Sequence, residues 1–427
     1  MLNQVKTALA QLGVELYQIE EVHGESLECF FVRKNLDLKR RTATDDMTVT
    51  VYKAFEKDGK KLLGSSQAHL HPGMETGEIT ESLKKAAFAA SLAGNPYYDL
   101  YEGKKEEHIP SASGFAAHTL EENMQTMVEA LYAEDTQEDT FINSAEVFIR
   151  RNTKHIVSST GTDVSFETCD VWGEYVIQCP APQDVETYHQ FSYREPDAEA
   201  LRAVIRENIA MTRARSQAKV APPTGEYPVI ISGKEVAGMM RYYLMRSDAS
   251  MVYQKFSNFQ VGDNVQGEDV EGDKLSITLK AQAPYSDEGI PMKDRVLLEN
   301  GELKTLHGAT RFARYLDIEP TGNYRGIEIP AGSKSLDELK SGKYLHVVTF
   351  SGLNMNPLTG YFGGEIRLAF YCDGETVTPV TGGSISGNFV EKQKQMTFSS
   401  DLYQSADYTG PFALRIEGVS VAGAKND

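Results

Sequence analysis

A break rich in proline and glycine near the middle of the chain constrains the fold more than any other feature. Pro222, Pro223 and Gly225 follow directly on a segment with helical periodicity. Proline cannot continue a helix and glycine favours turns, so this stretch predicts a domain boundary. A chain of 427 residues is also longer than one typical domain. We therefore expect an N-terminal domain over residues 1–217 and a C-terminal domain over residues 222–427.

The segments before the break predict a sheet accompanied by three or four helices. Apolar residues recur at helical spacing in residues 2–12, 82–92, 120–131 and 197–217, and strand-forming runs occupy residues 27–32, 47–52 and 145–149. Asp58 and Gly59 form a hairpin-turn signal after the second of these runs.

The segments after the break have a different composition. Glycines become frequent and short strands dominate, and only residues 235–246 and 336–339 suggest helices. We expect Phe362, Phe389 and Phe412 to pack in the core of this half. The predicted fold class is α+β, with an N-terminal sheet-plus-helices domain and a C-terminal strand-rich domain that is barrel-like or sandwich-like.

Charge and hydropathy exclude some classes of partner. Asp plus Glu is 61 and Lys plus Arg is 43, which gives a formal net charge of −18. An acidic surface repels phosphate backbones, so we expect no direct binding of nucleic acid or of an anionic membrane. The first residues lack the pattern of a secretory signal, and no apolar run approaches the ~18 residues of a spanning helix. The sequence therefore predicts a cytoplasmic protein.

The sequence offers little support for a metal centre of its own. A helical zinc site needs two histidines about one turn apart with a glutamate beside one of them, and none of the nine histidines makes such a pair. His69 and His71 could share one face of a strand, although surface or hairpin histidines are the simpler interpretation. The four cysteines are irregularly spaced, which favours reduced thiols. Nucleophile-elbow and phosphate-loop motifs are also missing from the sequence.

Four motifs in the C-terminal half resemble those of the TldD/PmbA family, in particular its PmbA (TldE) branch. They are TGNYR at residues 321–325, NPLTGYF at 356–362, SGNF at 386–389 and GVSVAG at 418–423. The resemblance implies the family's protease fold and a cytosolic metalloprotease in which TldD and TldE act as a pair. The family's older label, modulator of DNA gyrase, rests on an indirect link, and the net charge gives no reason to expect DNA binding.

The resemblance also implies that the zinc ligands are missing from this chain. In the TldD branch, a His-Glu-x-x-x-His helix and a cysteine near the C-terminus hold zinc, and Lys234, Glu235 and Met239 stand where that motif would be. An ammonium group has no lone pair to donate, and a thioether is a poor zinc ligand. Cys372 lies well upstream of residues 397–400, where the third ligand would fall. We expect zinc only in a TldD-type partner.

The function that the resemblance implies is that of a non-catalytic subunit. It would pair with a TldD-type zinc-bearing homologue and help to bind unfolded or leader peptides. Asn323, Arg325, Asn356 and Thr359 are candidates for lining the cleft, because polar loop residues can hold a peptide backbone. Each of them could equally satisfy nearby loop carbonyls.

Two alternatives remain open from the sequence. One is a self-contained hydrolase with a non-zinc site, for which Asp287, Glu288, Asp294 and Arg325 are conceivable participants. Solvated loop charges around Gly289 are the simpler interpretation of those residues. The other is a homodimeric peptide-binding protein that has no enzyme partner.

Overall fold

The computed structural model describes residues 1–423, so the last four residues of the predicted C-terminal domain lie outside the described part. Helices make up 23% and strands 44% of the chain, which confirms the α+β class. Within the described residues, the strands form three sheets, one before residue 194 and two after residue 224. The helix α4 (Ala198–Gln217) ends and the strand β8 (Gly225–Ser232) begins on either side of the predicted boundary. The division into domains 1–217 and 222–427 stays a prediction.

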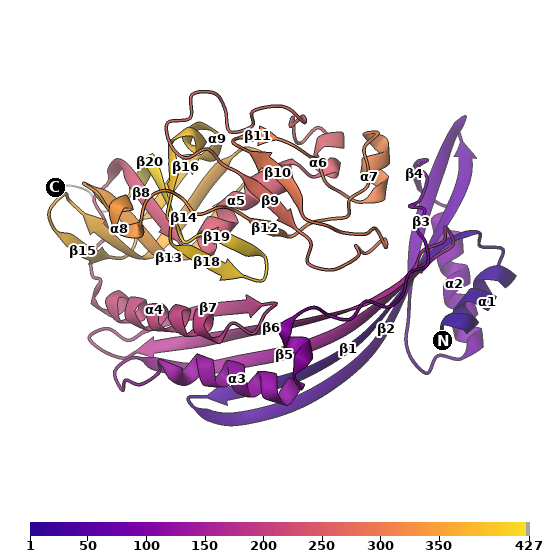
Figure 1. Cartoon of the computed structure of the whole chain (residues 1–427), viewed down its shortest axis with the longest axis horizontal. Helices are drawn as coiled ribbons and strands as arrows, with labels where there is room; N and C mark the ends of the chain where they lie inside the picture. Colours follow the sequence, from indigo (N-terminus) through magenta and orange to yellow (C-terminus); the bar gives the residue numbers. More distant parts are fainter. Residues whose placement is uncertain (424–427) are drawn as a thin grey trace.

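The N-terminal sheet has seven antiparallel strands in the order β4-β3-β2-β1-β5-β6-β7. Their bounds are Leu16–Val32 (β1), Asn35–Lys57 (β2), Lys60–Leu70 (β3), Gly94–Pro96 (β4), Phe141–Ser158 (β5), Asp163–Cys179 (β6) and Val185–Tyr193 (β7). Figure 1 shows these long strands curving beneath the C-terminal half and extending beyond it. Asp58 and Gly59, with φ of 52° and 69°, join β2 to β3, which confirms the predicted hairpin turn.

Helices cover one face of this sheet at both of its ends. The helices α1 (Leu2–Gln11) and α2 (Thr76–Ala90) pack over one end, and α3 (Leu120–Ala133) and α4 pack over the other. The four predicted N-terminal helices are therefore present. The helix α2 begins earlier than predicted because Glu75 and Glu78 form a capping box ahead of its apolar stripe.

The opposite face of the sheet is turned toward the C-terminal half. Side chains alternate along a strand, so Ile19 and Leu27 of β1 face the helices while Gln18 lies on the other face. The Gln18 amide donates a hydrogen bond of 2.7 Å to the carbonyl oxygen of Asp287 in the C-terminal half. Lys154 of β5 reaches the carboxylate of the same residue.

The C-terminal half contains a closed five-stranded barrel, as the strand-rich, barrel-like prediction allowed. The barrel order is β13-β8-β20-β16-β14, and pairing of β13 with β14 closes it. The barrel strands after β8 are Tyr344–Met355 (β13), Tyr361–Cys372 (β14), Ser384–Asn388 (β16) and Ala413–Ala422 (β20), with Val377–Val380 (β15) and Met396–Phe398 (β17) added at its edges. The helix α5 (Lys234–Arg246) packs its apolar residues into the same core.

A six-stranded sheet lies beside the barrel, in the order β11-β10-β9-β12-β19-β18. Its strands are Ile277–Lys280 (β9), Arg295–Glu299 (β10), Glu302–Leu303 (β11), Gly326–Glu328 (β12), Leu402–Ser405 (β18) and Tyr408–Pro411 (β19). Short helices connect these elements: Ala249–Tyr253 (α6), Thr310–Tyr315 (α7), Leu336–Leu339 (α8) and Phe389–Lys392 (α9). Two short 3-10 turns occupy Gly114–Ala117 and Gln393–Gln395. Within residues 1–423, none of the helices has both the length and the apolar character needed to cross a membrane.

The predicted aromatic core residues are only partly confirmed. Phe362 and Phe389 are almost fully buried in the main C-terminal core. Phe412 is half-buried, because it packs at the edge of a smaller cluster around Tyr344 and Leu339.

Replacing Phe389 tests how far the barrel core depends on a single ring. The ring lies 5.0 Å from that of Tyr242 and 5.7 Å from that of Tyr243, measured between centroids. We expect Phe389→Ala to lower the free energy of unfolding by about 3–5 kcal/mol, because it leaves a cavity in a packed core. Urea unfolding followed by circular dichroism measures this change. Phe88→Ala, at a ring that is 66% exposed, is the matched control, with an expected change within about 0.5 kcal/mol.

Candidate functional site

A cleft lies between the inner face of the N-terminal sheet and the six-stranded sheet. Two adjoining hollows of about 520 Å³ and 570 Å³ form this cleft. They share lining residues from both halves of the chain, among them Thr168 and Arg194 from the N-terminal half and Lys280 and Gln282 from the C-terminal half. Volumes of this size fall within the range of about 300–1,000 Å³ that is typical of ligand pockets.

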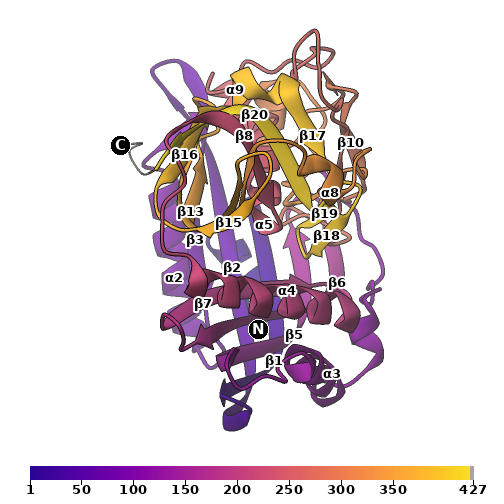
Figure 2. The same cartoon turned by 90° about the vertical axis from the view of Figure 1, so that its left-hand side faces the viewer.

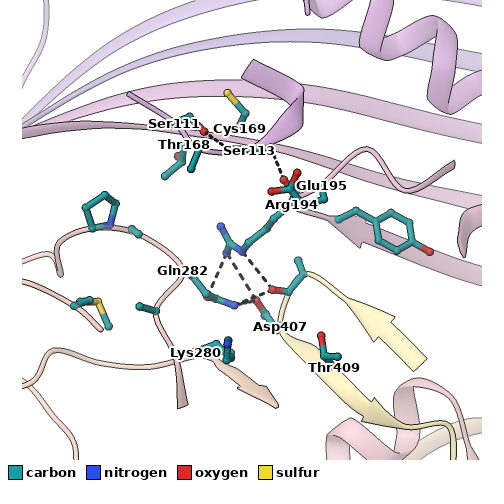
Figure 3. Close-up of a pocket in the computed structure, with 18 of the residues that line it drawn as sticks. Ser111, Ser113, Thr168, Cys169, Arg194, Glu195, Lys280, Gln282, Asp407 and Thr409 are labelled. Atoms are coloured by element: carbon teal, nitrogen blue, oxygen red, sulfur yellow. Dashed lines mark hydrogen bonds and ion pairs between the residues drawn. The ribbon is translucent and has the colours of Figure 1, made fainter. Parts of the chain in front are cut away.

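A polar network joins the two halves in the first hollow (Figure 3). Arg194 follows β7, Gln282 follows β9, and Ala406 and Asp407 form the turn between β18 and β19. Nε of Arg194 donates to the carbonyl of Ala406 at 3.3 Å, and its Nη2 donates to Oε1 of Gln282 at 3.2 Å. Nε2 of Gln282 donates to the Ala406 carbonyl at 2.9 Å and to Oδ1 of Asp407 at 2.7 Å. The network therefore fixes the β18–β19 turn against the end of β7.

The second hollow contains two lysines that are held by carboxylates. Nζ of Lys154 lies 2.9 Å from Asp287 and 3.3 Å from Glu20. Burial lowers the pKa of Lys154, but its bonds to Asp287 and Glu20 outweigh burial, so the pKa lies above its ordinary value. Lys280 is bound in the same way by Asp294 at 2.5 Å and by Glu328 at 2.9 Å.

Asn323 and Arg325, which were predicted to line a cleft, both lie in the second hollow. The loop that carries them is fixed at two points. Gly322 has φ of +77°, and a Cβ at this position would meet the Cβ of Ser286 at 2.6 Å, so the loop requires glycine here. The ring of Tyr324 is buried, and its hydroxyl donates to the carbonyl of Lys293 at 2.6 Å. The side chains on either side of Tyr324 are consequently exposed.

The other two predicted cleft residues, Asn356 and Thr359, lie in the turn between β13 and β14. Oδ1 of Asn356 accepts hydrogen bonds from the backbone amides of Leu358 at 2.9 Å and Thr359 at 3.3 Å. Oγ1 of Thr359 accepts one from the amide of Tyr361 at 3.2 Å. Neither residue lines the two hollows, because their side chains close this turn.

The positions that the resemblance aligns with the zinc motif do not converge on one point. Lys234 is exposed at the start of α5, and Glu235 beside it is half-buried. Met239 is 1% exposed and belongs to the main C-terminal core. This donor set does not fit a zinc ion, because one position is a cation and another is a thioether inside the core. Among residues 1–423, no three His, Cys, Asp or Glu side chains are arranged to hold a metal.

Lys234 and Glu235 instead line a third hollow of about 110 Å³, between α4 and the start of α5. Figure 2 shows α4 lying beneath the barrel. Glu207 of α4 lines this hollow. Burial raises the pKa of Glu235 and that of Glu207, and the positive charges of Lys234 and Lys340, respectively, offset part of this rise.

Two further side chains of the third hollow are strongly affected by burial. Burial, followed by the charges of Glu235 and Glu207, raises the pKa of Tyr403 to about 12. Burial and the charge of Lys234 lower the pKa of His189 to about 3, so its imidazole is neutral near pH 7. Sequence reasoning missed Glu207, Tyr403 and His189, since no local motif connects residues from α4, β18 and β7.

The carboxylates considered for a self-contained hydrolase have structural partners. Asp287 pairs with Lys154, and Oε2 of Glu288 accepts hydrogen bonds from the amide and hydroxyl of Thr310 at 2.7 and 2.8 Å. Burial raises the pKa of Asp294, but bonds from Lys280 and from a backbone amide outweigh burial and leave it below its ordinary value. Asp294 is not among the residues that line the hollow containing Asp287, Glu288 and Arg325. The structure therefore brings Asp287, Glu288 and Arg325 into one hollow and leaves Asp294 outside its lining.

Comparisons with known proteins define the class to which this barrel and its altered motif belong. Residues 224–423 match the family profile described as the PmbA/TldA metallopeptidase C-terminal domain. Residues 224–423 therefore carry the C-terminal domain of this metallopeptidase family, and the similarity to proteins named PmbA and TldD supports a relation of the chain to the TldD/PmbA family.

Similar proteins occur in both bacteria and archaea. The metalloprotease PmbA homologue of Haemophilus influenzae is 24% identical over 214 residues, which is 47% of each chain. A metalloprotease of Methanothermobacter thermautotrophicus is 27% identical over 197 residues, covering 41% of this chain and 43% of that protein. The matched region thus spans about half the length of these curated relatives.

The fold is similar to that of a solved relative over almost its whole length. The crystal structure of TldE from Thermococcus kodakarensis matches 99% of this chain and 100% of that one, with a TM-score of 0.77 and 19% identity. At this level of identity, the likeness shows the fold alone.

The third hollow yields a prediction about the charge coupling of its side chains. We expect Lys234→Met to raise the pKa of Glu235 further, because the cation that offsets burial is removed. Titration of the Glu235 carboxyl carbon by NMR, assigned with Glu235→Gln, measures the change. Lys340→Met is the control, and it should raise the pKa of Glu207 instead. An unchanged or lower pKa of Glu235 in Lys234→Met would contradict the described geometry.

Proposed function

We propose that this chain is a TldE-like, non-catalytic subunit of a TldD/TldE-type metalloprotease in the cytoplasm. A TldD-type homologue holds the zinc ion, and the present chain helps to bind unfolded or leader peptides. The observation that carries the proposal is that Lys234 and Met239 stand where the family's two imidazole donors are expected, and that no cysteine occupies residues 397–400. Lys234 lines the third hollow, whereas Met239 lies inside the core. Glu235 alone cannot act as the family's general base, because it has no metal-bound water to activate.

The cleft between the two sheets supports a peptide-binding role. It is lined by both halves of the chain, and its walls combine apolar side chains such as Phe166 and Met292 with polar ones such as Gln282 and Asn323. Mixed walls of this kind suit a peptide whose backbone needs hydrogen-bond partners and whose side chains vary. The family membership and the TldE-like fold add to this support.

Co-expression with a TldD-type homologue tests the proposal. We expect the full chain to co-elute with a homologue that carries His-Glu-x-x-x-His, and peptidase activity to require both chains. Zinc analysis should find the metal only when the homologue is present, and a chelator should abolish the activity. Stoichiometric zinc on this chain alone, or peptidase activity of this chain that resists chelation, would contradict the proposal.

Equivalent glutamate variants in the two chains provide a sharper comparison. We expect Glu235→Gln in this chain to leave the activity of the complex within about twofold, since a carboxylate without a metal contributes no general base. The same change at the motif glutamate of the homologue should remove the activity. A large loss of peptidase activity in Glu235→Gln, with co-elution unchanged, would mean that this chain contributes to catalysis and would contradict the proposal. Peptidase assays on the two purified complexes measure both effects.

A further inference from the structure

Arg325 differs from the other charged side chains of the second hollow. It is exposed in the loop before β12, and within the described chain its guanidinium makes no hydrogen bond or ion pair. Lys154 and Lys280 in the same hollow each contact two carboxylates. Arg194 is held by Gln282 and lies 3.9 Å from Asp407. Arg325 is therefore the lining cation, among those of residues 1–423, whose donors remain available.

The carboxylates that line this hollow have other partners, and neither forms an ion pair with Arg325 in the described residues. Asp287 is already bound by Lys154 at 2.9 Å. Oε2 of Glu288 accepts both hydrogen bonds that Thr310 offers at the start of α7. A guanidinium presents five N–H donors in a planar fork that matches two carboxylate oxygens.

Asn323 adds an unengaged amide to the same loop. Its side chain is exposed, and it makes no hydrogen bond within the described residues. Tyr324 is buried between Asn323 and Arg325, so the loop is anchored at its centre while the two polar side chains flank the anchor. A loop held in this way keeps the backbone of both residues in place before a ligand arrives, which reduces the entropy lost on binding.

We propose that Arg325 and Asn323 form a subsite for a carboxylate of the bound peptide. The carboxylate comes either from the C-terminus of the peptide or from an aspartate or glutamate side chain. This inference rests on the proposed peptide-binding function and specifies which peptides the cleft prefers. A single carboxylate fits one unpaired guanidinium, whereas a polyanion would be repelled by the net charge of −18.

Binding of labelled peptides to the full chain tests the subsite. Three fluorescent probes share one short neutral sequence: an amidated peptide, the same peptide with a free C-terminal carboxylate, and an amidated peptide with one internal glutamate. We expect at least one carboxylate-bearing probe to bind roughly fivefold to tenfold more tightly than the neutral probe, measured by fluorescence anisotropy. The probe that gains affinity identifies the source of the carboxylate.

Variants separate the subsite from general charge effects. Arg325→Gln should remove the difference in affinity between the probes, a readout that a general weakening of peptide binding would not produce. Arg367→Gln is the matched control, because it removes one exposed arginine of β14 that lines neither hollow of the cleft. The difference between the probes should persist in this control.

The possible failures are distinguishable. If the neutral probe binds but no carboxylate adds affinity, or if Arg325→Gln retains the difference, the subsite is overturned and the peptide-binding function stands. If none of the probes binds to the chain, alone or with a TldD-type homologue, both the subsite and the peptide-binding function are overturned.

Discussion

The packing of α5 against the closed barrel decides what this chain can do chemically. Val236, Met239, Met240 and Tyr243 are buried in the main core, and this fixes the rotation of the helix about its axis. The start of α5 is consequently directed toward α4 and the third hollow, whereas position 239 lies inside the core. A thioether suits this location, because it fills an apolar space without needing a hydrogen-bond partner. The helix that carries the altered motif therefore contributes to the core of the barrel.

A second constraint comes from the contact between the two halves of the chain. The long N-terminal strands have one face under the helices, which leaves the other face to meet the C-terminal half. The face turned toward the C-terminal half carries polar side chains, because it lines a cleft instead of a hydrophobic core. Lys154 lies in β5 and Arg194 follows the end of β7, and both bind groups from the C-terminal half. The side chains that join the two halves therefore also line the cleft.

Features with local signals were predictable from the sequence, and features that depend on tertiary arrangement were not. The turn at Asp58 and Gly59 and the helix α4 follow from short-range patterns, and the structure confirms both. The full length of β2 was missed, because its first half is exposed and lacks a continuous apolar pattern. Asn323 and Asn356 look equivalent as polar loop residues, yet one lines a cleft and the other closes a turn. Only the contacts of the folded chain distinguish them.

The presence of Glu235 at its motif position is not by itself a sign of retained catalysis. In the first turn of α5, a carboxylate lies near the positive end of the helix dipole, which favours its charged form. Burial acts in the opposite direction and raises the pKa of Glu235, and the charge of Lys234 offsets part of that rise. Lys234 reduces the cost of this burial, but the same ammonium would repel a divalent cation. The residue that makes the carboxylate tolerable in this hollow thus also makes the hollow unsuitable for zinc.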